Sequence, residues 1–67
     1  MQDLKRIGGN ILKIRKLKKL SQEDLAGEAE IDRSFLSEIE NGHKNLSVLT
    51  LLKIATALGV SPERLLK

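Results

Sequence analysis

Four polar side chains fall within six consecutive residues of this chain, and together they could contact the edges of DNA bases. They are Arg33, Ser34, Ser37 and Glu38. An arginine guanidinium can donate two hydrogen bonds to guanine O6 and N7, a serine hydroxyl can bond to either base of a pair, and a glutamate can accept from cytosine N4. The alternative is an ordinary polar helix surface, on which Arg33 would only pair with Asp32 or Glu30.

A short helix followed by a tight turn precedes these side chains. Ser21 lies just before a run of helix-forming residues, and Asp24 follows three positions later, which is a capping-box pattern with the shorter acid. The helix should extend from Gln22 to about Glu28. Its inward-facing residues are expected to be Leu25, Ala26 and Ala29. Glu30 stands where a tight turn often uses glycine, so we expect it to hold a mildly strained backbone.

The four polar side chains lie on a second short helix. Asp32 offers a side-chain oxygen at its N-cap, and Asn41–Gly42 ends it, because glycine accepts the left-handed backbone of a helix C-cap. The apolar pattern of this helix is Phe35, Leu36 and Ile39. Phe35, the only aromatic residue, is more often a core residue than a contact to a thymine methyl group. Residues 21–42 therefore have the dimensions of a helix-turn-helix, whose second helix enters the DNA major groove.

A longer helix is predicted before this unit, over residues 3–18. Its apolar residues recur at three- and four-residue steps and form one face: Leu4, Ile7, Ile11, Ile14 and Leu17. Gly8 is interpreted as a position of close packing, whereas Gly9 has no evident role. Arg15 lies close to the apolar face, so it needs a carboxylate partner if it is partly buried, and Glu40 is the expected partner.

Two further helices are predicted over residues 48–58 and 62–67. Ser47 caps the first and Gly59 ends it, while Ser61 and Pro62 begin the second. The helix over residues 48–58 is apolar nearly all round, and a chain this short cannot cover it on every side. We therefore expect the surplus apolar surface of residues 48–67 to meet a second copy of the chain. The residues expected at this dimer interface are Leu49, Val60, Leu65 and Leu66.

The composition excludes several classes of protein. The chain has 67 residues, which is one domain at most, and no cysteine, which excludes disulfides and a thiolate zinc site. His43 is the only histidine, so no histidine cluster can bind a metal. With no cysteine or tyrosine and no phosphate-binding glycine motif, we expect no enzyme activity, no cofactor and no small-molecule ligand. No apolar run approaches 18 residues, so we expect a soluble, cytoplasmic protein without membrane contact.

The charge is unevenly distributed along the chain. The net charge is +3, with +6 in residues 1–20, −6 in residues 21–40 and +3 in residues 41–67. The helix-turn-helix itself is therefore acidic, and the cationic flanks must supply most of the attraction to phosphate. The lysines of the first helix either form a solvated surface or reach phosphates in part: Lys13, Lys16, Lys18 and Lys19.

These motifs resemble the lambda-repressor-like helix-turn-helix family (the Cro/CI or XRE type) of phage and bacterial regulators. The resemblance covers about residues 7–66 and rests on three stretches taken together, which are LSQEDLA (20–26), DRSFLSEIENG (32–42) and LLKIATALGVSPERLL (51–66). The second stretch, followed by a short loop and Asn45–Leu46, looks most like the controller proteins of restriction–modification systems. The family implies an all-α, compact five-helix domain over residues 1–67, with the helix-turn-helix at its second and third helices.

The resemblance also implies roles for individual residues. The base-facing positions are Arg33, Ser34, Ser37 and Glu38, and the phosphate-binding positions are Gln22, Asn41, His43, Lys44 and Asn45. Arg15 and Glu40 match the family's ion pair between its first and third helices. Two positions depart from the family. Glu38 is acidic where repressors often carry a neutral or basic residue, and Leu49 is apolar where the family usually has a charge.

Two functions are consistent with these features of the sequence. The first is a sequence-specific transcription regulator that binds double-stranded DNA as a homodimer, on a near-palindromic operator, through its third helix. The alternative is a protein-interaction module, such as an antitoxin or an adaptor, that uses the apolar face of the last two helices. A stable homodimer would favour the regulator, whereas a monomer that associates only with another protein would favour the adaptor.

Overall fold

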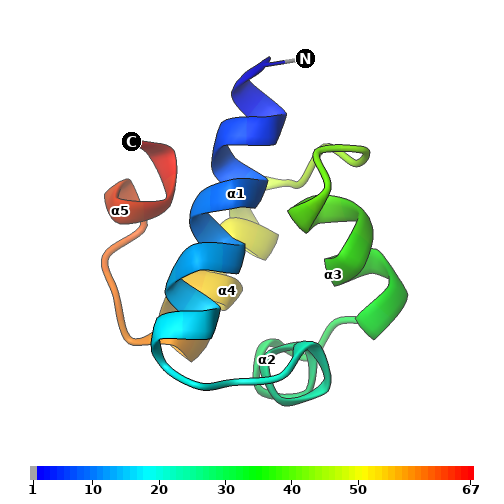
Figure 1. The fold of residues 1–67 in the computed structure, drawn as a ribbon, viewed down its shortest axis with the longest axis vertical. Helices are drawn as coiled ribbons and strands as arrows, with labels where there is room; N and C mark the ends of the chain where they lie inside the picture. The colour runs from blue at the N-terminus through cyan, green and yellow to red at the C-terminus, as the bar shows by residue number, and fades with distance from the viewer. Residues whose placement is uncertain (1) are drawn as a thin grey trace.

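The computed structural model describes residues 2–67, and this part of the chain folds into five helices (Figure 1). They are α1 (Gln2–Leu17), α2 (Gln22–Ala29), α3 (Arg33–Glu40), α4 (Val48–Leu58) and α5 (Glu63–Leu66). The predicted all-α, five-helix fold class is confirmed. The bounds of α1 to α4 agree with the sequence prediction to within about a residue, whereas α5 is shorter than the predicted range of 62–67.

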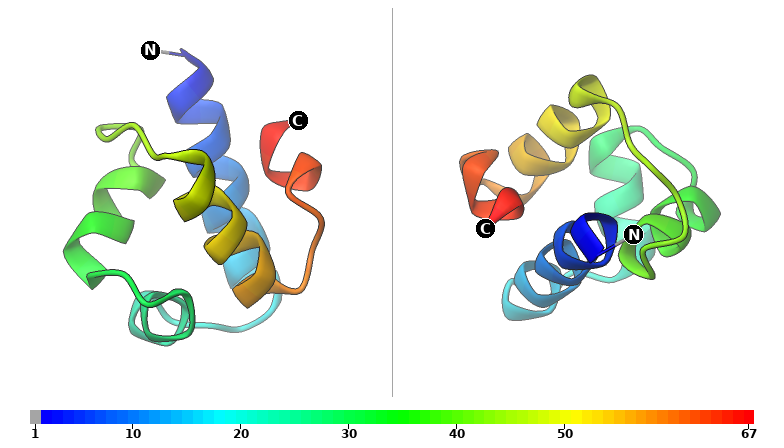
Figure 2. Two further views of the ribbon diagram at one scale, coloured as in Figure 1. Left: turned by 180° about the vertical axis from the view of Figure 1, so that it is seen from behind. Right: turned by 90° about the horizontal axis from the view of Figure 1, so that it is seen from above.

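Helix α1 occupies the middle of the molecule, and α4 crosses behind it in the view of Figure 1. Helix α3 lies on one side of α1 and α5 on the other, and Figure 2 shows the same arrangement from behind and from above. The packing contacts agree with this picture, because α1 packs on α3 and α5 while α2 packs on α3 and α4. The helix-turn-helix of α2 and α3 is therefore supported by α1 and α4.

Three of the helix ends form as the sequence predicts. The Ser21 hydroxyl accepts from the backbone N–H of Asp24, and the Asp24 carboxylate accepts from the backbone N–H of Ser21, so the capping box is complete. The Ser47 hydroxyl caps α4 by accepting from the backbone N–H of Thr50. Gly59 ends α4 with a left-handed backbone (φ of 71°). These ends hold α2 and α4 in their observed lengths.

Two other helix starts differ from the prediction. Asp32 has the extended backbone of an N-cap residue, but its side chain makes no capping hydrogen bond to α3. Helix α5 is preceded by Pro62 in a helical conformation, so Pro62 rather than Ser61 is its N-cap residue. Asp32 and Ser61 are both residue types that commonly cap helices. The residue type alone does not determine whether the side chain makes the capping hydrogen bond.

The core consists of apolar residues from all five helices. Its fully buried large side chains are Ile11, Leu25, Leu36, Ile39, Ile54, Leu58 and Leu65. Leu65 was expected at a dimer interface, and that prediction is wrong: its side chain is buried because α5 folds back on α1, where Asn10 also donates to the Leu65 carbonyl oxygen at 3.0 Å. Leu17 was expected on the core face of α1, yet it is 71% exposed because the helix ends there.

Two neighbouring glycines of α1 have different surroundings. A Cβ atom on Gly8 would overlap the backbone carbonyl oxygen of Ile39 and lie 2.9 Å from that of Glu40. Gly8 therefore allows α1 and α3 to approach closely, as the sequence predicts. A Cβ atom on Gly9 would meet nothing within 4 Å, and nothing in the structure explains a glycine there.

The turn between α2 and α3 contains a residue under backbone strain. Glu30 adopts a left-handed conformation (φ of 59°), which a residue other than glycine seldom takes, and this confirms the prediction for that position. Its backbone N–H donates to the carbonyl oxygen of Gly27 at 3.3 Å. Within residues 2–67, no helix is both long and apolar enough to span a membrane.

Candidate nucleic-acid interface

Helix α3 has one apolar face and one polar face. Leu36 and Ile39 are buried against the rest of the molecule, and Phe35 is half-buried and packs against the same core. The opposite face carries the polar residues expected at a DNA groove: Arg33, Ser34 and Glu38 are exposed, and Ser37 is half-buried. The apolar face of α3 is therefore fixed in the protein core, and its polar face presents hydrogen-bond donors and acceptors to solvent.

The connection from α3 to α4 extends the polar surface beyond the end of α3. Asn41, His43, Lys44 and Asn45 are all exposed, and they are the residues expected to contact phosphates. The sharp change of direction occurs at Gly42, whose φ of 75° is left-handed. The Gly42 N–H donates to the carbonyl oxygen of Ile39 at 3.0 Å, so the last turn of α3 holds the start of this connection.

An ion pair between α1 and α3 lies in the interior, as the sequence predicts. Arg15 Nε donates to Glu40 Oε2 at 2.7 Å, and Arg15 Nη2 donates to Glu40 Oε1 at 3.1 Å. Arg15 Nη1 donates to the carbonyl oxygen of Leu20 at 2.9 Å. Arg15 is 8% exposed and Glu40 is 7% exposed. Two parallel bonds between a guanidinium and a carboxylate fix both position and angle, so the pair orients α3 on α1.

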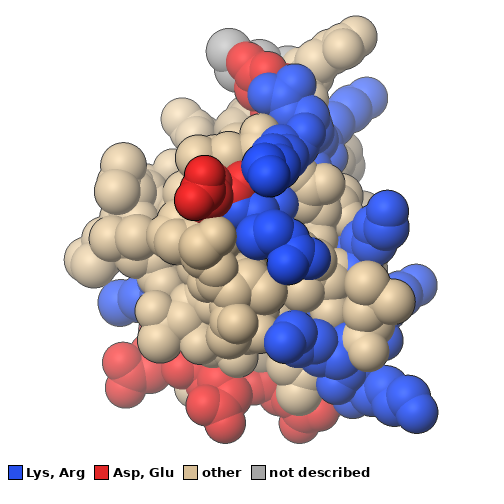
Figure 3. Space-filling view, turned by 90° about the vertical axis from the view of Figure 1, so that its left-hand side faces the viewer, with Lys and Arg blue, Asp and Glu red and all other residues tan. Residues whose placement is uncertain are grey.

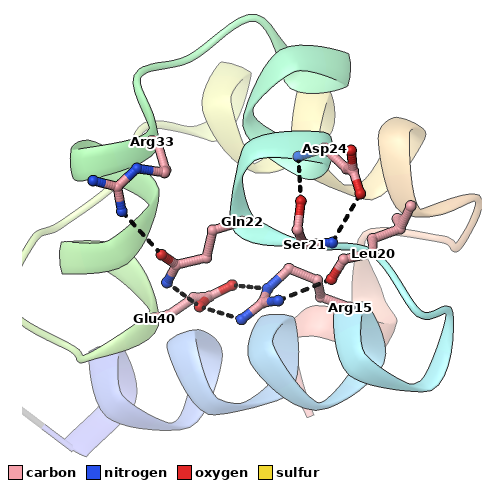
Figure 4. Close-up of polar contacts among 7 residues, drawn as sticks. All are labelled: Arg15, Leu20, Ser21, Gln22, Asp24, Arg33 and Glu40. Carbon is pink, nitrogen blue, oxygen red and sulfur yellow. Dashed lines mark hydrogen bonds and ion pairs between the residues drawn. The ribbon is translucent and has the colours of Figure 1, made fainter.

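Gln22, the first residue of α2, joins this buried pair to the surface of α3 (Figure 4). Its side-chain Nε2 donates to Glu40 Oε1 at 2.9 Å, and its Oε1 accepts from Arg33 Nη1 at 3.4 Å. The family resemblance implies a phosphate contact for Gln22. In the structure, both polar atoms of its amide also make hydrogen bonds within the protein. No periodicity or motif of the sequence indicates this connection, because it depends on how α2 and α3 cross.

The capping box fixes the residue that precedes Gln22. The backbone N–H of Ser21, and then the hydroxyl of Ser21, donate hydrogen bonds that hold the pKa of the Asp24 carboxyl below its usual range. The negative charge also lies at the N-terminal end of α2, where the helix dipole favours an anion. The start of α2, and with it the backbone of Gln22, is therefore held by groups that sequence reasoning identified.

The surface charge is segregated. Figure 3 shows the face on which α5 lies, with Lys and Arg gathered along the α1 side and most of the Asp and Glu at the end formed by α2; further acidic side chains lie near the middle and at the opposite end of this view. A broad uncharged area lies on the α4 side of the same view. Among residues 2–67, no group of three or more His, Cys, Asp or Glu side chains is arranged to hold a metal ion.

Helices α4 and α5 carry large apolar side chains that the fold leaves in solvent. Val48 is 72% exposed, Leu49 is 63% exposed, and Leu52 and Leu66 are between 40 and 50% exposed. Val60 is half-buried and packs against the core. Of the four residues expected at a dimer interface, Leu49 and Leu66 are thus on the surface, Val60 is partly accessible, and Leu65 is not.

A family model described as helix-turn-helix matches residues 11–65, which is most of the chain. The chain belongs to the helix-turn-helix family. This family places it among DNA-binding transcription regulators, and the expected membership of the XRE-type group is confirmed.

Relatives of this helix-turn-helix protein include several controller proteins. The chain is 44% identical over 63 residues to the control protein C.MunI of a Mycoplasma species, covering 91% of this chain and 85% of the relative. It is 47% identical over 47 residues to the control protein C.BamHI of Bacillus amyloliquefaciens, covering 70% and 58%. Both relatives are named as control proteins.

A solved structure gives the same result for the fold. The restriction–modification controller protein C.AhdI from Aeromonas hydrophila superposes with a TM-score of 0.95 and 40% sequence identity, covering 97% of this chain and 98% of that one. The predicted similarity to controller proteins of restriction–modification systems is therefore confirmed by sequence and by structure.

Proposed function

We propose that this protein is a sequence-specific transcription regulator that binds a near-palindromic DNA operator as a homodimer, with α3 in the major groove. The observation that carries the proposal is the two-faced character of α3: Leu36 and Ile39 are buried, while Arg33, Ser34 and Glu38 stand exposed on its other side. A helix of this kind can lie in a groove without leaving apolar groups in contact with the bases.

The exposed residues of α3 have complementary roles in this proposal. Arg33 donates to guanine O6 and N7, and the hydroxyls of Ser34 and Ser37 bond to neighbouring base edges. Glu38 accepts from cytosine N4 and repels the acceptor-rich edge of guanine, so it excludes some sequences as well as favouring others. Selectivity then comes from a small set of side chains on one helix face.

The phosphate contacts come from the connection after α3 and set the register of the helix on the duplex. Asn41, His43, Lys44 and Asn45 are exposed beside the end of α3, where the backbone of a duplex lying on that helix would pass. Because α2 is acidic, Lys44 is the main source of attraction in this segment.

A second copy of the chain covers the apolar area of α4 and α5 in this proposal. Val48, Leu49 and Leu52 are exposed on α4 and Leu66 is exposed on α5, and exposed apolar side chains of this kind are typical of a subunit interface. In a two-fold dimer the two copies of α3 should lie roughly 34 Å apart, about one turn of DNA. The operator should then be a near-palindrome with half-sites at that spacing.

Selection of bound duplexes from a random pool tests the proposal most directly, because it returns the site, its symmetry and its spacing together. We expect two inverted half-sites about 10 base pairs apart, centre to centre. Recovery of a single asymmetric site, or of no preferred site, would overturn the dimeric mode or the sequence specificity respectively.

Two substitutions separate base contacts from phosphate contacts on the selected operator. Arg33→Ala should cost about 1–3 kcal/mol of binding free energy and relax the base preference at one position in each half-site. Lys44→Ala should weaken binding evenly across sequences and reduce the slope of log affinity against log salt by about two, one for each copy of the chain. Equal loss on all sequences from Arg33→Ala would make Arg33 a phosphate contact instead.

A protein-interaction module remains the second candidate, and the acidic surface of α2 beside the apolar area of α4 favours it. In that case the apolar area would bind another protein and DNA binding would be secondary. Gel filtration with chemical crosslinking separates the two functions. A stable homodimer supports the regulator, and a monomer that forms a complex only with a co-purified protein supports the module.

A further inference from the structure

The first turns of α1 lie directly against the connection that follows α3, and Gly42 is the residue at which they meet (Figures 1 and 2). A Cβ atom on Gly42 would lie 2.6 Å from Lys5 Cγ, 3.0 Å from Lys5 Cα and 3.2 Å from the Lys5 backbone nitrogen. Gly42 is buried, although Asn41 and His43 on either side of it are exposed. Glycine is therefore needed at position 42 both for its left-handed backbone and for the space that Lys5 occupies.

The side chain of Lys5 leaves α1 toward this connection. Its Cγ lies closer to the Cβ position of Gly42 than its Cα does, so the aliphatic part of the side chain crosses the backbone of the connection. A lysine can cover a surface with its methylene groups in this way while its ammonium group stays in water, and Lys5 as a whole is exposed. The ammonium group of Lys5 therefore lies on the same side of the molecule as the exposed residues His43 and Lys44.

The charge of Lys5 is not neutralised within the protein. Lys5 takes part in neither of the ion pairs that residues 2–67 form, and Asp3, the nearest acid along the chain, is paired with Arg6 at 3.0 Å. The connection beside Lys5 carries Lys44, and residues 41–47 include no acidic residue. Two cationic side chains from separate elements thus stand beside the end of α3, and such a surface attracts an anion.

We infer that Lys5 binds a DNA phosphate next to the one that Lys44 contacts, so that the DNA-binding surface extends from the helix-turn-helix onto α1. This inference rests on the proposed function. A backbone phosphate fits the site because it is anionic, lies in water and recurs along the duplex. Lys5 reaches it as a flexible point charge and contacts no base, so it adds affinity without changing the base preference.

The structure distinguishes Lys5 from the lysines that follow it on α1. Gly8 marks the side of α1 that faces α3. Lys5 precedes Gly8 by three positions, which places it about 60° from that side at about 3.6 residues per turn. Lys13 follows Gly8 by five positions, about 140° around the helix, so it points away from α3. One helix therefore carries two exposed lysines of equal charge, of which only Lys5 lies beside the proposed DNA surface.

Salt titrations of binding to the selected operator test the inference. Lys5→Met removes the ammonium group and keeps an unbranched apolar side chain over Gly42, so the fold should persist, which circular dichroism checks. The slope of log affinity against log salt should fall by about two, one phosphate for each copy of the chain, with the base preference unchanged. The loss of affinity between roughly 50 and 200 mM salt should then be about tenfold smaller than in the wild type.

Two further variants make the result specific to the position of the charge. Lys13→Met removes the same charge from the same helix and should leave the slope nearly unchanged, because Lys13 points away from the duplex. Lys5→Arg keeps a cation on a long side chain and should retain the slope of the wild type. Equal reductions of the slope by Lys5→Met and Lys13→Met would show that only the total charge of α1 matters, and the inference would fail.

Neutral methylphosphonates at single positions of the operator identify the phosphate. At one position in each half-site the replacement should weaken binding of the wild type by about three- to tenfold and have little further effect on Lys5→Met. If an operator is selected and no position shows this dependence, the inference fails alone.

Titrations on a duplex of random sequence separate this inference from the proposed function. If no operator is selected, the proposed function fails, and the contact of Lys5 is supported only if Lys5→Met lowers the salt slope on the random duplex while Lys13→Met does not. The absence of binding to any duplex would overturn both.

Discussion

The outer faces of α3 and α4 are both left uncovered by a single chain, and they differ in chemistry. The α3 face carries a guanidinium, hydroxyls and a carboxylate, all of which can form hydrogen bonds with water. The α4 face carries Val48, Leu49 and Leu52, whose apolar side chains form no hydrogen bonds with water. A polar face is stable in water and can bind a charged, hydrated partner such as DNA. An apolar face is stabilised when another surface covers it and removes it from water. One small fold thus offers two surfaces suited to two kinds of partner.

The two faces also differ in how they are held. Helix α3 is located by specific contacts, namely the Arg15–Glu40 pair and the close approach of α1 at Gly8. Helix α4 is located by apolar packing through Ile54, Ala55 and Leu58, with the Ser47 cap at its start. The position of α3 should therefore be sensitive to single substitutions, while the position of α4 should be more tolerant.

The largest effect is expected from breaking the buried ion pair at one end. Arg15→Met should lower the free energy of unfolding by about 3–5 kcal/mol, because it leaves the Glu40 carboxylate buried beside Gln22 alone. Chemical denaturation monitored by circular dichroism measures this loss. In a chain of 67 residues it is enough to unfold a large share of the molecules.

Removing the second charge should restore much of this stability. Arg15→Met with Glu40→Leu leaves no lone buried charge, so its unfolding free energy should lie well above that of Arg15→Met. If the single and double variants were equally unstable, the loss would come from packing around residue 15 and not from an unpaired carboxylate. The α3 face would then be held in the same way as the α4 face.

The second prediction concerns the apolar face. Leu49→Asp should weaken the proposed homodimer by about 3 kcal/mol, more than a hundredfold in dissociation constant, because each substitution counts twice across a two-fold interface. The fold of the single chain should be little affected, since Leu49 is 63% exposed. Sedimentation equilibrium measures the dissociation constant.

Leu17→Asp is the matched control for the α4 face. Leu17 is 71% exposed, as apolar as Leu49, and lies at the end of α1 rather than on α4. We expect the dimer to persist in Leu17→Asp. If both substitutions weakened the dimer equally, the loss would reflect the added surface charge and not a contact made by Leu49. The α4 face would then not be the subunit interface.

Much of the fold follows from local patterns in the sequence. The capping box at Ser21, the Ser47 cap and Gly59 mark helix ends, because each depends on residues only a few positions apart. The Arg15–Glu40 pair could also be predicted, since an arginine beside an apolar face requires a carboxylate and Glu40 ends the helix that must pack there. Predictions of this kind need only periodicity and chemical type.

The remaining features depend on how helices cross, and the sequence does not encode crossings in any simple pattern. Gln22 contacts Glu40 and Arg33, which are 18 and 11 residues away in the sequence, because α2 packs on α3 and the Gln22 side chain bonds to both. Leu65 was expected on the surface and is buried because α5 turns back on α1. Periodicity identifies the apolar face of a helix but does not determine which other element covers it.

Two adjacent glycines give the third prediction. Gly8→Ala should lower stability by about 1–3 kcal/mol, because its Cβ would meet the backbone carbonyls of Ile39 and Glu40, and backbone atoms cannot rotate away. Gly9→Ala should raise stability by about 0.5–1 kcal/mol, because its Cβ meets nothing and alanine favours a helix. Thermal unfolding of the two variants checks the difference in sign. Destabilisation by both would show that α1 needs flexibility here, and α3 would not be located by a close approach.

The smallest effect is expected at the start of α2. The hydrogen bonds from Ser21 lower the pKa of Asp24 in the folded protein below the value of about 3.9 for an unfolded aspartate. The ionised carboxylate therefore stabilises the fold above about pH 4, and this contribution is lost as the pH falls through the lower, folded-state pKa. Asp24→Asn keeps an acceptor for the Ser21 N–H but cannot ionise. Its thermal midpoint should lie below that of the wild type at neutral pH, and the gap should close at acidic pH.

The same prediction distinguishes the start of α2, which packs on α3, from the start of α4. Helix α4 begins at the Ser47 hydroxyl, which does not titrate in this range, so acid should loosen the start of α2, beside Gln22, before it affects the start of α4. Asp32→Asn is the control, because Asp32 precedes α3 without a capping hydrogen bond and its replacement should leave the thermal midpoint nearly unchanged. A gap between Asp24→Asn and the wild type that stayed constant with pH would mean that hydrogen-bond geometry, and not the charge of Asp24, holds α2 in place.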